Sequence, residues 1–354
     1  LDYDDTHFIY IGHPSVAVLP AALAIAEHTA ASGTDFLDAA LIGVETACRI
    51  GHWLGRDHYD LGFHQTATSG TFGAAMAASR LLGLNSERAR HALAIASTRA
   101  SGLKSQFGTM GKPYNAGIAA SNGVEAALLA DAGFVSRADG LECAQGFAAT
   151  HGGEDANPAE VLEGLGSGFV FESVEHKFHA CCHGLHAAIE AIGAARSAHD
   201  FMPGDIRQVT IEVNPSWLKV CDIAKPRTGL EAKFSYRLAA ALALTGRDTS
   251  DLSTFNEAVC SDTELNDLRD RVVATANASL PDTAARVCID LNAGGRIETD
   301  HDLATPLPAA IRQEKVRAKA ATLLGPTRAE HIWRQINALS DAGRMVDWSS
   351  LFAG

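Results

Sequence analysis

The first fifteen residues combine side chains that suit proton transfer. They include three aspartates and two histidines, and they precede an alanine-rich run with helical character at 16–31. Backbone N–H groups at the start of a helix lack partners and favour anions. Packing does not account for so many titratable side chains among so few apolar ones. The segment therefore predicts a polar site at a helix start.

A second polar group lies at residues 62–68 (GFHQTAT), just before a run rich in glycine and alanine. His64 can act as an acid or a base, while Thr66 and Thr68 can bind a carboxylate at the start of the following helix. A simpler interpretation makes Thr66 a helix cap and His64 a hydrogen-bonded loop histidine. The residues leave both interpretations open.

A third candidate is a lysine in a glycine-rich turn. Lys112 lies within residues 108–117 (GTMGKPYNAG), ahead of a helix with few charges. The segment lacks the GxxxxGK[ST] spacing of a phosphate-binding loop, which argues against a nucleotide. The turn predicts a cation held over a cavity, and the alternative is a solvent-exposed loop lysine.

Residues 176–186 (HKFHACCHGLH) hold four histidines and two cysteines, which invites a zinc hypothesis. The spacing matches no standard zinc motif, and no second Cys/His cluster completes a tetrahedral site. We therefore predict no metal. The alternative interpretation is a site-lining loop in which Lys177 is a cation and His186 begins the next helix.

A fifth polar segment spans residues 226–235 (PRTGLEAKFS). Arg227 and Lys233 can orient carboxylates, and an arginine can do so through two parallel hydrogen bonds. The same pattern is also typical of an ordinary helix start that carries surface charges.

Helices and strands must position these five polar segments, and the sequence between the segments predicts such elements. Apolar periodicity predicts helices at 20–31, 35–54, 66–82, 86–100 and 117–132. Alternation then predicts a strand at 206–213, and a hairpin signal at 292–295 (NAGG) predicts strands at 286–291 and 296–299 on its two sides. Helices are predicted between these strands, at 233–244 and 262–274. We predict a mainly α fold with an α+β part. It comprises a helical domain (1–175), an α+β lid domain (176–308) and C-terminal helices (309–354) that return to the helical domain.

The bulk composition narrows the class of protein. The chain has 354 residues and a formal net charge of −13, which argues against nucleic acid or an anionic membrane as partner. No apolar run reaches the length of a membrane span. The seven scattered cysteines are typical of reduced thiols, which favours a cytoplasmic protein. An anionic substrate would need local cations to offset the overall charge.

Four motifs together resemble the MmgE/PrpD family, over nearly the whole chain. They are DYDDTH (2–7) with HPS (13–15), GFH (62–64) with TAT (66–68), GTM (108–110) with KP (112–113), and EAKFS (231–235). The resemblance implies a large helical domain, a smaller α+β lid and an active site in the cleft between them. It also implies a homodimer, catalysis without a cofactor, and further helices before residue 1. Family activities include 2-methylcitrate dehydratase, cis-aconitate decarboxylase and iminodisuccinate epimerase.

The resemblance also assigns positions that line the site. These are Asp2, Thr6, His13, His64, Lys112 and Lys177. We predict a catalytic set of Asp2, His13, His64, Lys112 and Lys177. The predicted substrate-binding set is Thr6, Thr66, Thr68, His186, Arg227 and Lys233.

Three positions depart from the family pattern. Cys182 stands where the decarboxylases carry a second lid histidine, Leu238 stands at a frequent tyrosine position, and Asn115 replaces a common histidine. These departures leave the exact reaction open and do not support decarboxylation.

The shared chemistry is proton transfer at a carbon next to a carboxylate. Lys112 and Lys177 are the candidate cations for the developing charge, each worth roughly 3–4 kcal/mol if well placed. His13 and His64 suit acid and base roles, and Asp2 can orient His13 or act as the base. We predict a hydro-lyase acting on a small polycarboxylate such as 2-methylcitrate. The alternatives are a dicarboxylate epimerase, a cis-aconitate-type decarboxylase, or a metal-binding protein without catalytic activity.

Overall fold

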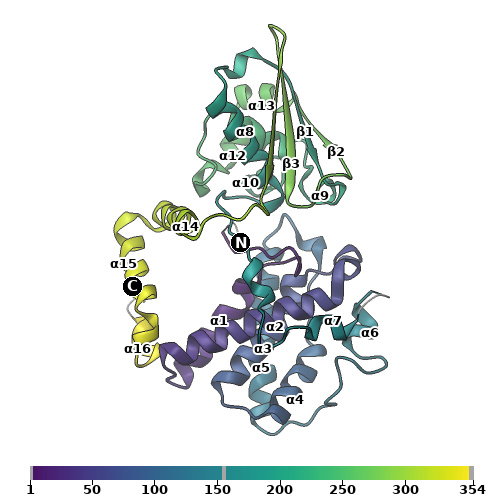
Figure 1. Cartoon of the computed structure of the whole chain (residues 1–354), viewed down its shortest axis with the longest axis vertical. Coiled ribbons are helices and arrows are strands. Elements are labelled where there is room, and N and C mark those ends of the chain that lie inside the picture. The colour runs from purple at the N-terminus through teal and green to yellow at the C-terminus, as the bar shows by residue number, and fades with distance from the viewer. Residues whose placement is uncertain (1–2, 154–156, 351–354) are drawn as a thin grey trace. The chain divides into compact units, whose positions relative to one another are not determined.

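The computed structural model describes residues 3–153 and 157–350, and this part of the chain forms two compact units (Figure 1). The first unit contains residues 3–175 and the C-terminal residues from Trp333. The second unit contains residues 176–332. Asp2 lies outside the described residues.

The first unit is helical and is built around one buried helix. Its longer helices are α1 (Pro14–His28), α2 (Gly33–Asp60), α3 (Gln65–Leu81), α4 (Ser86–Ser97) and α5 (Gly111–Asp131). Helix α3 packs against the other four, and nearly all of its side chains are buried. Its small residues allow this: a Cβ on Gly73 would lie 2.5 Å from the carbonyl oxygen of Gly43 on α2. The approach of the helix backbones therefore depends on glycine at the contact.

The remaining elements of this unit are short. They are α6 (Phe147–His151), α7 (Pro158–Leu162), the C-terminal half of α15 (Pro326–Asn337) and α16 (Met345–Ser350). Leu339 and Met345 are buried in the same apolar cluster as α1 and α2. The backbone N–H of Met345 donates to the carbonyl of Ala31 at 2.8 Å, which fixes the C-terminal segment against the turn after α1.

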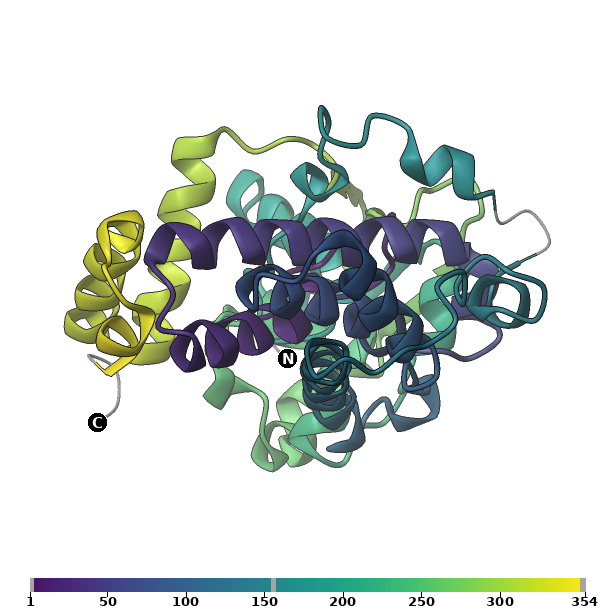
Figure 2. The ribbon, with the colours of Figure 1, turned by 90° about the horizontal axis from the view of Figure 1, so that it is seen from below.

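Helix α2 begins earlier and ends later than its predicted span of 35–54. Its cap is Ser32, whose side chain accepts from the backbone N–H of Asp35 while Asp35 reciprocates, a complete capping box. The helix continues to Asp60 through a kink at Gly55, where φ is 67°. Helix α1 lies alongside α2 (Figure 2).

The second unit contains a four-stranded mixed sheet in the order β2-β1-β3-β4. Strand β1 (Ile206–Val213) pairs in parallel with β2 (Val272–Ala276) and antiparallel with β3 (Ala284–Leu291), which pairs antiparallel with β4 (Arg296–Asp302). The helices α8 (His186–Ala198) and α11 (Tyr236–Leu244) pack against the sheet and against each other. The predicted fold class, mainly α with an α+β part, is confirmed.

Four further short helices complete the connections of this unit. They are α9 (Pro215–Cys221), α10 (Gly229–Ala232), α12 (Glu257–Ser261) and α13 (Thr263–Arg269). The prediction that a helix continues through residue 274 is wrong, because the chain leaves α13 and enters β2 at Val272. Val272 is fully buried and pairs with Val209 of β1, so sheet pairing decides the conformation there.

Helix α14 (Ala309–Leu324) belongs to the second unit, whereas we expected the chain to return to the helical domain from residue 309. Lys315 of α14 provides the contacts: its Nζ lies 3.3 Å from Glu190 Oε1 on α8 and 4.9 Å from the ring centre of Phe178. The return to the first unit comes at Trp333.

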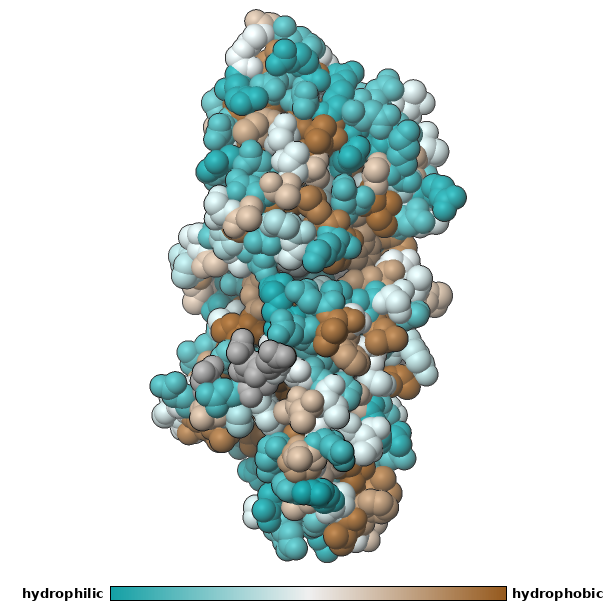
Figure 3. Space-filling view, turned by 90° about the vertical axis from the view of Figure 1, so that its right-hand side faces the viewer, coloured by the Kyte–Doolittle hydropathy of each residue, from teal (hydrophilic) through white to brown (hydrophobic). Residues whose placement is uncertain are grey.

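Apolar side chains are interspersed with polar ones on the face shown in Figure 3. Within the described residues, no helix is both long enough and apolar enough to cross a membrane.

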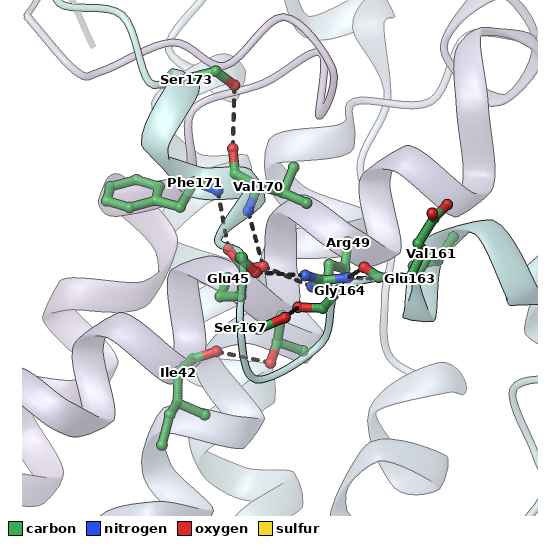
Figure 4. A network of polar contacts seen from close by, with 12 residues as sticks. Ile42, Glu45, Arg49, Val161, Glu163, Gly164, Ser167, Val170, Phe171 and Ser173 are labelled. Atoms are coloured by element: carbon green, nitrogen blue, oxygen red, sulfur yellow. Dashed lines mark hydrogen bonds and ion pairs between the residues drawn. The ribbon is translucent and has the colours of Figure 1, made fainter.

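A buried ion pair on α2 organises the loop that follows α7 (Figure 4). Arg49 Nε donates to Glu45 Oε1 at 2.6 Å, and both side chains are more than nine-tenths buried. Glu45 in turn accepts from the backbone N–H groups of Val170 and Phe171, at 3.0 and 2.9 Å. Arg49 also donates to three backbone carbonyls: those of Val161, Glu163 and Gly168. The pair thus satisfies backbone groups along the whole segment from 161 to 171.

We expect Arg49→Leu to lower the free energy of unfolding by about 3–5 kcal/mol, because it leaves the Glu45 carboxylate buried without its cation. Urea unfolding followed by circular dichroism would measure the change. The matched control is Arg80→Leu, since Arg80 pairs with Asp38 at 3.8 Å with both side chains about half exposed. This control should change the stability by less than about 1 kcal/mol. Equal effects of the two substitutions would contradict the assigned role of the buried pair.

Candidate functional site

The loop before α1 is fastened to the segment that the Glu45–Arg49 pair organises. Thr6 and Glu175 exchange two backbone hydrogen bonds, at 2.8 and 2.7 Å. His7 Nε2 donates to the carbonyl of Val170 at 2.7 Å, and its Nδ1 accepts from the backbone N–H of Tyr10 at 3.1 Å. Burial lowers the pKa of His7 below its usual value. His7 therefore holds the loop as a neutral, hydrogen-bonded residue.

His13 lies at the N-terminal cap of α1, and its side chain is held by the same loop. Its Nδ1 lies 2.6 Å from the backbone carbonyl of Asp5, 3.3 Å from Thr6 Oγ1 and 3.7 Å from Asp4 Oδ2. The Asp5 carboxylate accepts from the backbone N–H and the hydroxyl of Ser15. The Asp4 carboxylate, which lies near Nδ1, stabilises a protonated imidazole ring of His13. This environment suits a group that carries a proton.

Thr66 connects this loop to the start of α3. Its hydroxyl accepts from the backbone N–H of His13 at 3.0 Å. The loop before α1 lies so close to the start of α3 that position 12 must be glycine. A Cβ there would lie 3.0 Å from the Thr66 backbone nitrogen and 2.8 Å from Tyr10. Thr66 is therefore not the helix cap, a position taken by His64.

His64 and Lys112 share an aromatic neighbour, Phe107. The His64 ring meets the Phe107 ring edge-on at 4.9 Å, and Lys112 Nζ lies 5.2 Å from the same ring centre. Both side chains are more than nine-tenths buried. Asn115, one turn after Lys112 on α5, places its Nδ2 3.2 Å from His64 Nδ1. The structure thus brings together a buried cation, a buried imidazole and an amide.

Thr68 of α3 makes a different contact. Its hydroxyl lies 2.9 Å from His58 Nε2, and His58 Nδ1 donates to the carbonyl of His151 at 2.7 Å. His58 is fully buried and stacks on Phe63 at 4.4 Å between ring centres. Burial lowers the pKa of His58 to about 4, so the ring is neutral in the folded protein at neutral pH.

This lowered pKa predicts a loss of stability in acid. The unfolded chain takes up the His58 proton near pH 6.5, whereas the folded chain takes it up near pH 4, so stability falls as the pH drops between those values. We expect the stability difference between wild type and His58→Gln to shrink by about 2–3 kcal/mol from pH 7 to pH 4.5. Urea unfolding at both pH values would test this. A difference that does not change with pH would contradict a neutral, buried His58.

The second unit holds the other predicted site residues. Lys177 and His186 are almost fully buried, and the His186 ring lies 4.7 Å from His183 and 4.9 Å from His179. Burial, reinforced by the charges of neighbouring histidines and Lys177, holds the pKa of His186 well below its usual value. His179 Nε2 lies 3.4 Å from Glu190 Oε1. Within the described residues, no group of three or more His, Cys, Asp or Glu side chains is arranged to hold a metal ion.

The remaining two predicted residues lie around α10 of the second unit. Arg227 is exposed, and its backbone N–H donates to Glu231 Oε2 at 2.7 Å. The backbone carbonyl of Lys233 accepts from the N–H of Cys182 at 3.0 Å. This contact joins the EAKFS segment to the loop that carries Lys177.

Two residues that contact His64, namely Asn115 and Phe107, were not among the predicted site residues. Asn115 had been noted only as a departure from a family pattern, yet its spacing of three from Lys112 places both on one face of a helix. Phe107 carries no sequence signal of its role, because only the folded loop places its ring near both His64 and Lys112.

Two family models match the chain. The MmgE/PrpD N-terminal domain covers residues 1–159, and the MmgE/PrpD C-terminal domain covers residues 179–341. A cis-aconitate decarboxylase from Aspergillus terreus is 29% identical, over 99% of this chain and 77% of its own length. A human protein of the same name is 39% identical over 42% of this chain and 32% of its own. A cis-aconitate decarboxylase-like protein from Aspergillus oryzae is 34% identical over 54% and 43%.

Proposed function

Because the chain belongs to the MmgE/PrpD family, we propose that it is a lyase that transfers a proton at a carbon next to a carboxylate of a small polycarboxylate. The observation that carries this proposal is the pair of buried side chains Lys112 and His64, which lie near the Phe107 ring and are joined through Thr66 to the loop of His13. A buried cation and two imidazoles are the groups that such a reaction needs.

The difficult step is the formation of a carbanion. Its charge is tolerable when the neighbouring carboxylate takes it up as an enediolate, and this requires a cation or strong donors at the carboxylate oxygens. Lys112 supplies the cation in the first unit. Its burial beside the Phe107 ring strengthens its interaction with an anion, because water screens the charge less there. The overall charge of −13 makes such a local cation more important.

We place first the decarboxylation of a tricarboxylate that resembles cis-aconitate. The name of the Aspergillus terreus relative, which aligns with nearly the whole chain, supports this choice over our earlier expectation of a hydro-lyase. In this reaction the bond between carbon and a carboxylate breaks, carbon dioxide leaves, and the carbon skeleton gains one proton.

The second candidate is dehydration of a hydroxylated tricarboxylate such as 2-methylcitrate. Here a C–H proton and a hydroxyl group leave together as water, and a double bond forms. Cys182, which stands where the decarboxylases carry a second lid histidine, favours this candidate. Epimerisation of a dicarboxylate would use the same α-proton.

Proton NMR in buffered D₂O would test the proposal with cis-aconitate, citrate, 2-methylcitrate and iminodisuccinate. We expect deuterium at a carbon next to a carboxylate, and the product distinguishes loss of carbon dioxide, loss of water and epimerisation. Absence of both turnover and exchange with all four compounds would contradict the proposed function. Lys177 and the homodimer remain predictions, to be tested by a Lys177→Ala variant in the same assay and by light scattering.

A further inference from the structure

The side chain of Asn115 has a defined orientation because of its two neighbours. Its Nδ2 lies 3.3 Å from the backbone carbonyl of Leu103 and 3.2 Å from His64 Nδ1. A carbonyl oxygen only accepts, so the NH₂ group and not the amide oxygen must face Leu103. The second hydrogen of the same NH₂ group then points to His64. Nδ1 of His64 must therefore accept a hydrogen bond.

This contact determines the protonation state of His64. A ring that accepts at Nδ1 carries its single proton at Nε2. Charging the ring would place an N–H at Nδ1 directly against the N–H of Asn115, with loss of the hydrogen bond. The positive charge of Lys112, which lies near the same Phe107 ring, further opposes an imidazolium at His64. His64 is thus held neutral, as an N–H donor at Nε2.

His13 has the opposite arrangement. Its Nδ1 lies 2.6 Å from the backbone carbonyl of Asp5, which can only accept, so Nδ1 carries the proton. The lone pair of the neutral ring is then at Nε2. When Nε2 takes up a proton, the ring becomes an imidazolium that faces the Asp4 carboxylate at 3.7 Å. His13 can therefore gain and return a proton, whereas a neutral His64 would have to become an imidazolate to give one up.

We propose that His13 is the proton carrier, that His64 and Lys112 bind the carboxylate as uncharged and charged donors, and that Asn115 is a positioning residue for His64. This inference rests on the proposed function. His13 Nε2 takes the proton from carbon, and the C–H electron pair moves into the carboxylate, whose oxygens accept from His64 Nε2–H and Lys112 Nζ. In decarboxylation no C–H bond is broken first: the C–C bond to the leaving carboxylate breaks, carbon dioxide departs, and the electron pair moves into a remaining carboxylate as an enediolate. His13, protonated beforehand from solvent, then gives its Nε2 proton to that carbon and returns to the neutral state.

Nitrogen NMR of histidine-labelled full-length chain tests the tautomers without any substrate. Signals would be assigned by their loss in His13→Gln and His64→Gln. Between about pH 6 and 8 we expect His64 to bear one proton, at Nε2, and neutral His13 to bear its proton at Nδ1. A proton at Nδ1 of His64, or a charged His64 at pH 7, would overturn the proposal.

Asn115→Asp replaces the side-chain amide with a carboxylate of nearly the same size. A carboxylate accepts from Nδ1–H, so we expect His64 to move its proton to Nδ1 or to hold two protons at pH 7. Asn115→Ala removes the contact without supplying an acceptor, so it should not produce a doubly protonated ring. An unchanged His64 spectrum in Asn115→Asp, with the fold intact by circular dichroism, would contradict the positioning role.

Exchange of the substrate α-proton with D₂O tests the division of roles. His64→Gln keeps an N–H donor, so we expect it to retain exchange within about tenfold of wild type, while His13→Gln loses at least about a hundredfold. Equal loss in both variants would make His64 a second proton carrier and would overturn the proposal. If the tautomers are as expected but wild type exchanges no polycarboxylate, the proposed function fails while the tautomer assignment stands.

Discussion

Replacing His13 with alanine is expected to lower turnover of the tricarboxylate substrate at least about a hundredfold, the scale on which a general acid–base group contributes. The His13 ring is held by the carbonyl of Asp5 and lies 3.7 Å from the Asp4 carboxylate. Alanine removes the proton acceptor but leaves the backbone N–H that donates to Thr66. The loop should therefore keep its place while the proton transfer is lost. Steady-state kinetics on the preferred substrate of the NMR panel would measure the effect.

His28→Ala is the matched control for this experiment. His28 ends the same helix, is exposed, and makes no contact with the site loop among the described residues. We expect its turnover to stay close to that of wild type. If His13→Ala folds normally and works at a comparable rate, His13 has no part in the chemical step.

Lys112→Ala is expected to lower turnover by about a hundredfold to a thousandfold, the loss measured when one donor to a developing oxyanion is removed. Lys112 is 7% exposed and lies against the Phe107 ring, so water cannot easily replace its charge. Because the enediolate charge exists only in the transition state, kcat and kcat/KM should fall together. A rise in KM alone would mean that Lys112 binds the substrate without stabilising the reaction.

Lys104→Ala is the control for Lys112. Lys104 lies in the segment just before Lys112, but its Nζ lies 3.5 Å from the ring centre of Tyr59 and donates to the Tyr59 carbonyl at 2.9 Å. The substitution takes away one lysine charge close to Lys112 in sequence. It keeps the backbone carbonyl of residue 104, which accepts from the N–H of Phe107 at 2.9 Å. We expect turnover to be largely retained. A loss as large as that of Lys112→Ala would point to net charge, and not to position, as the important property.

Local sequence patterns determined most of the elements of this protein. Apolar periodicity placed the long helices of the first unit and alternation placed β1, because side-chain spacing within one element reflects one buried face. The glycine-containing turn at 292–295 placed β3 and β4 on its two sides. The sequence patterns gave wrong predictions where the structure of an element, or the unit to which it belongs, depends on residues far away in the sequence. Val272 forms a strand because it pairs with Val209. Helix α14 belongs to the second unit, where Lys315 contacts Glu190. Neither partner is visible within a short window of sequence.

The same division holds for the candidate site. The sequence alone singled out His13, His64 and Lys112, since their residue types and their places at the starts of helices are local properties. It did not single out Phe107 as their neighbour, or show that Asn115 donates to His64 while Asp5 accepts from His13. Those contacts set which ring nitrogen carries the proton. A tautomer depends on the partner that folding brings within hydrogen-bonding distance, and so only the tertiary structure decides it.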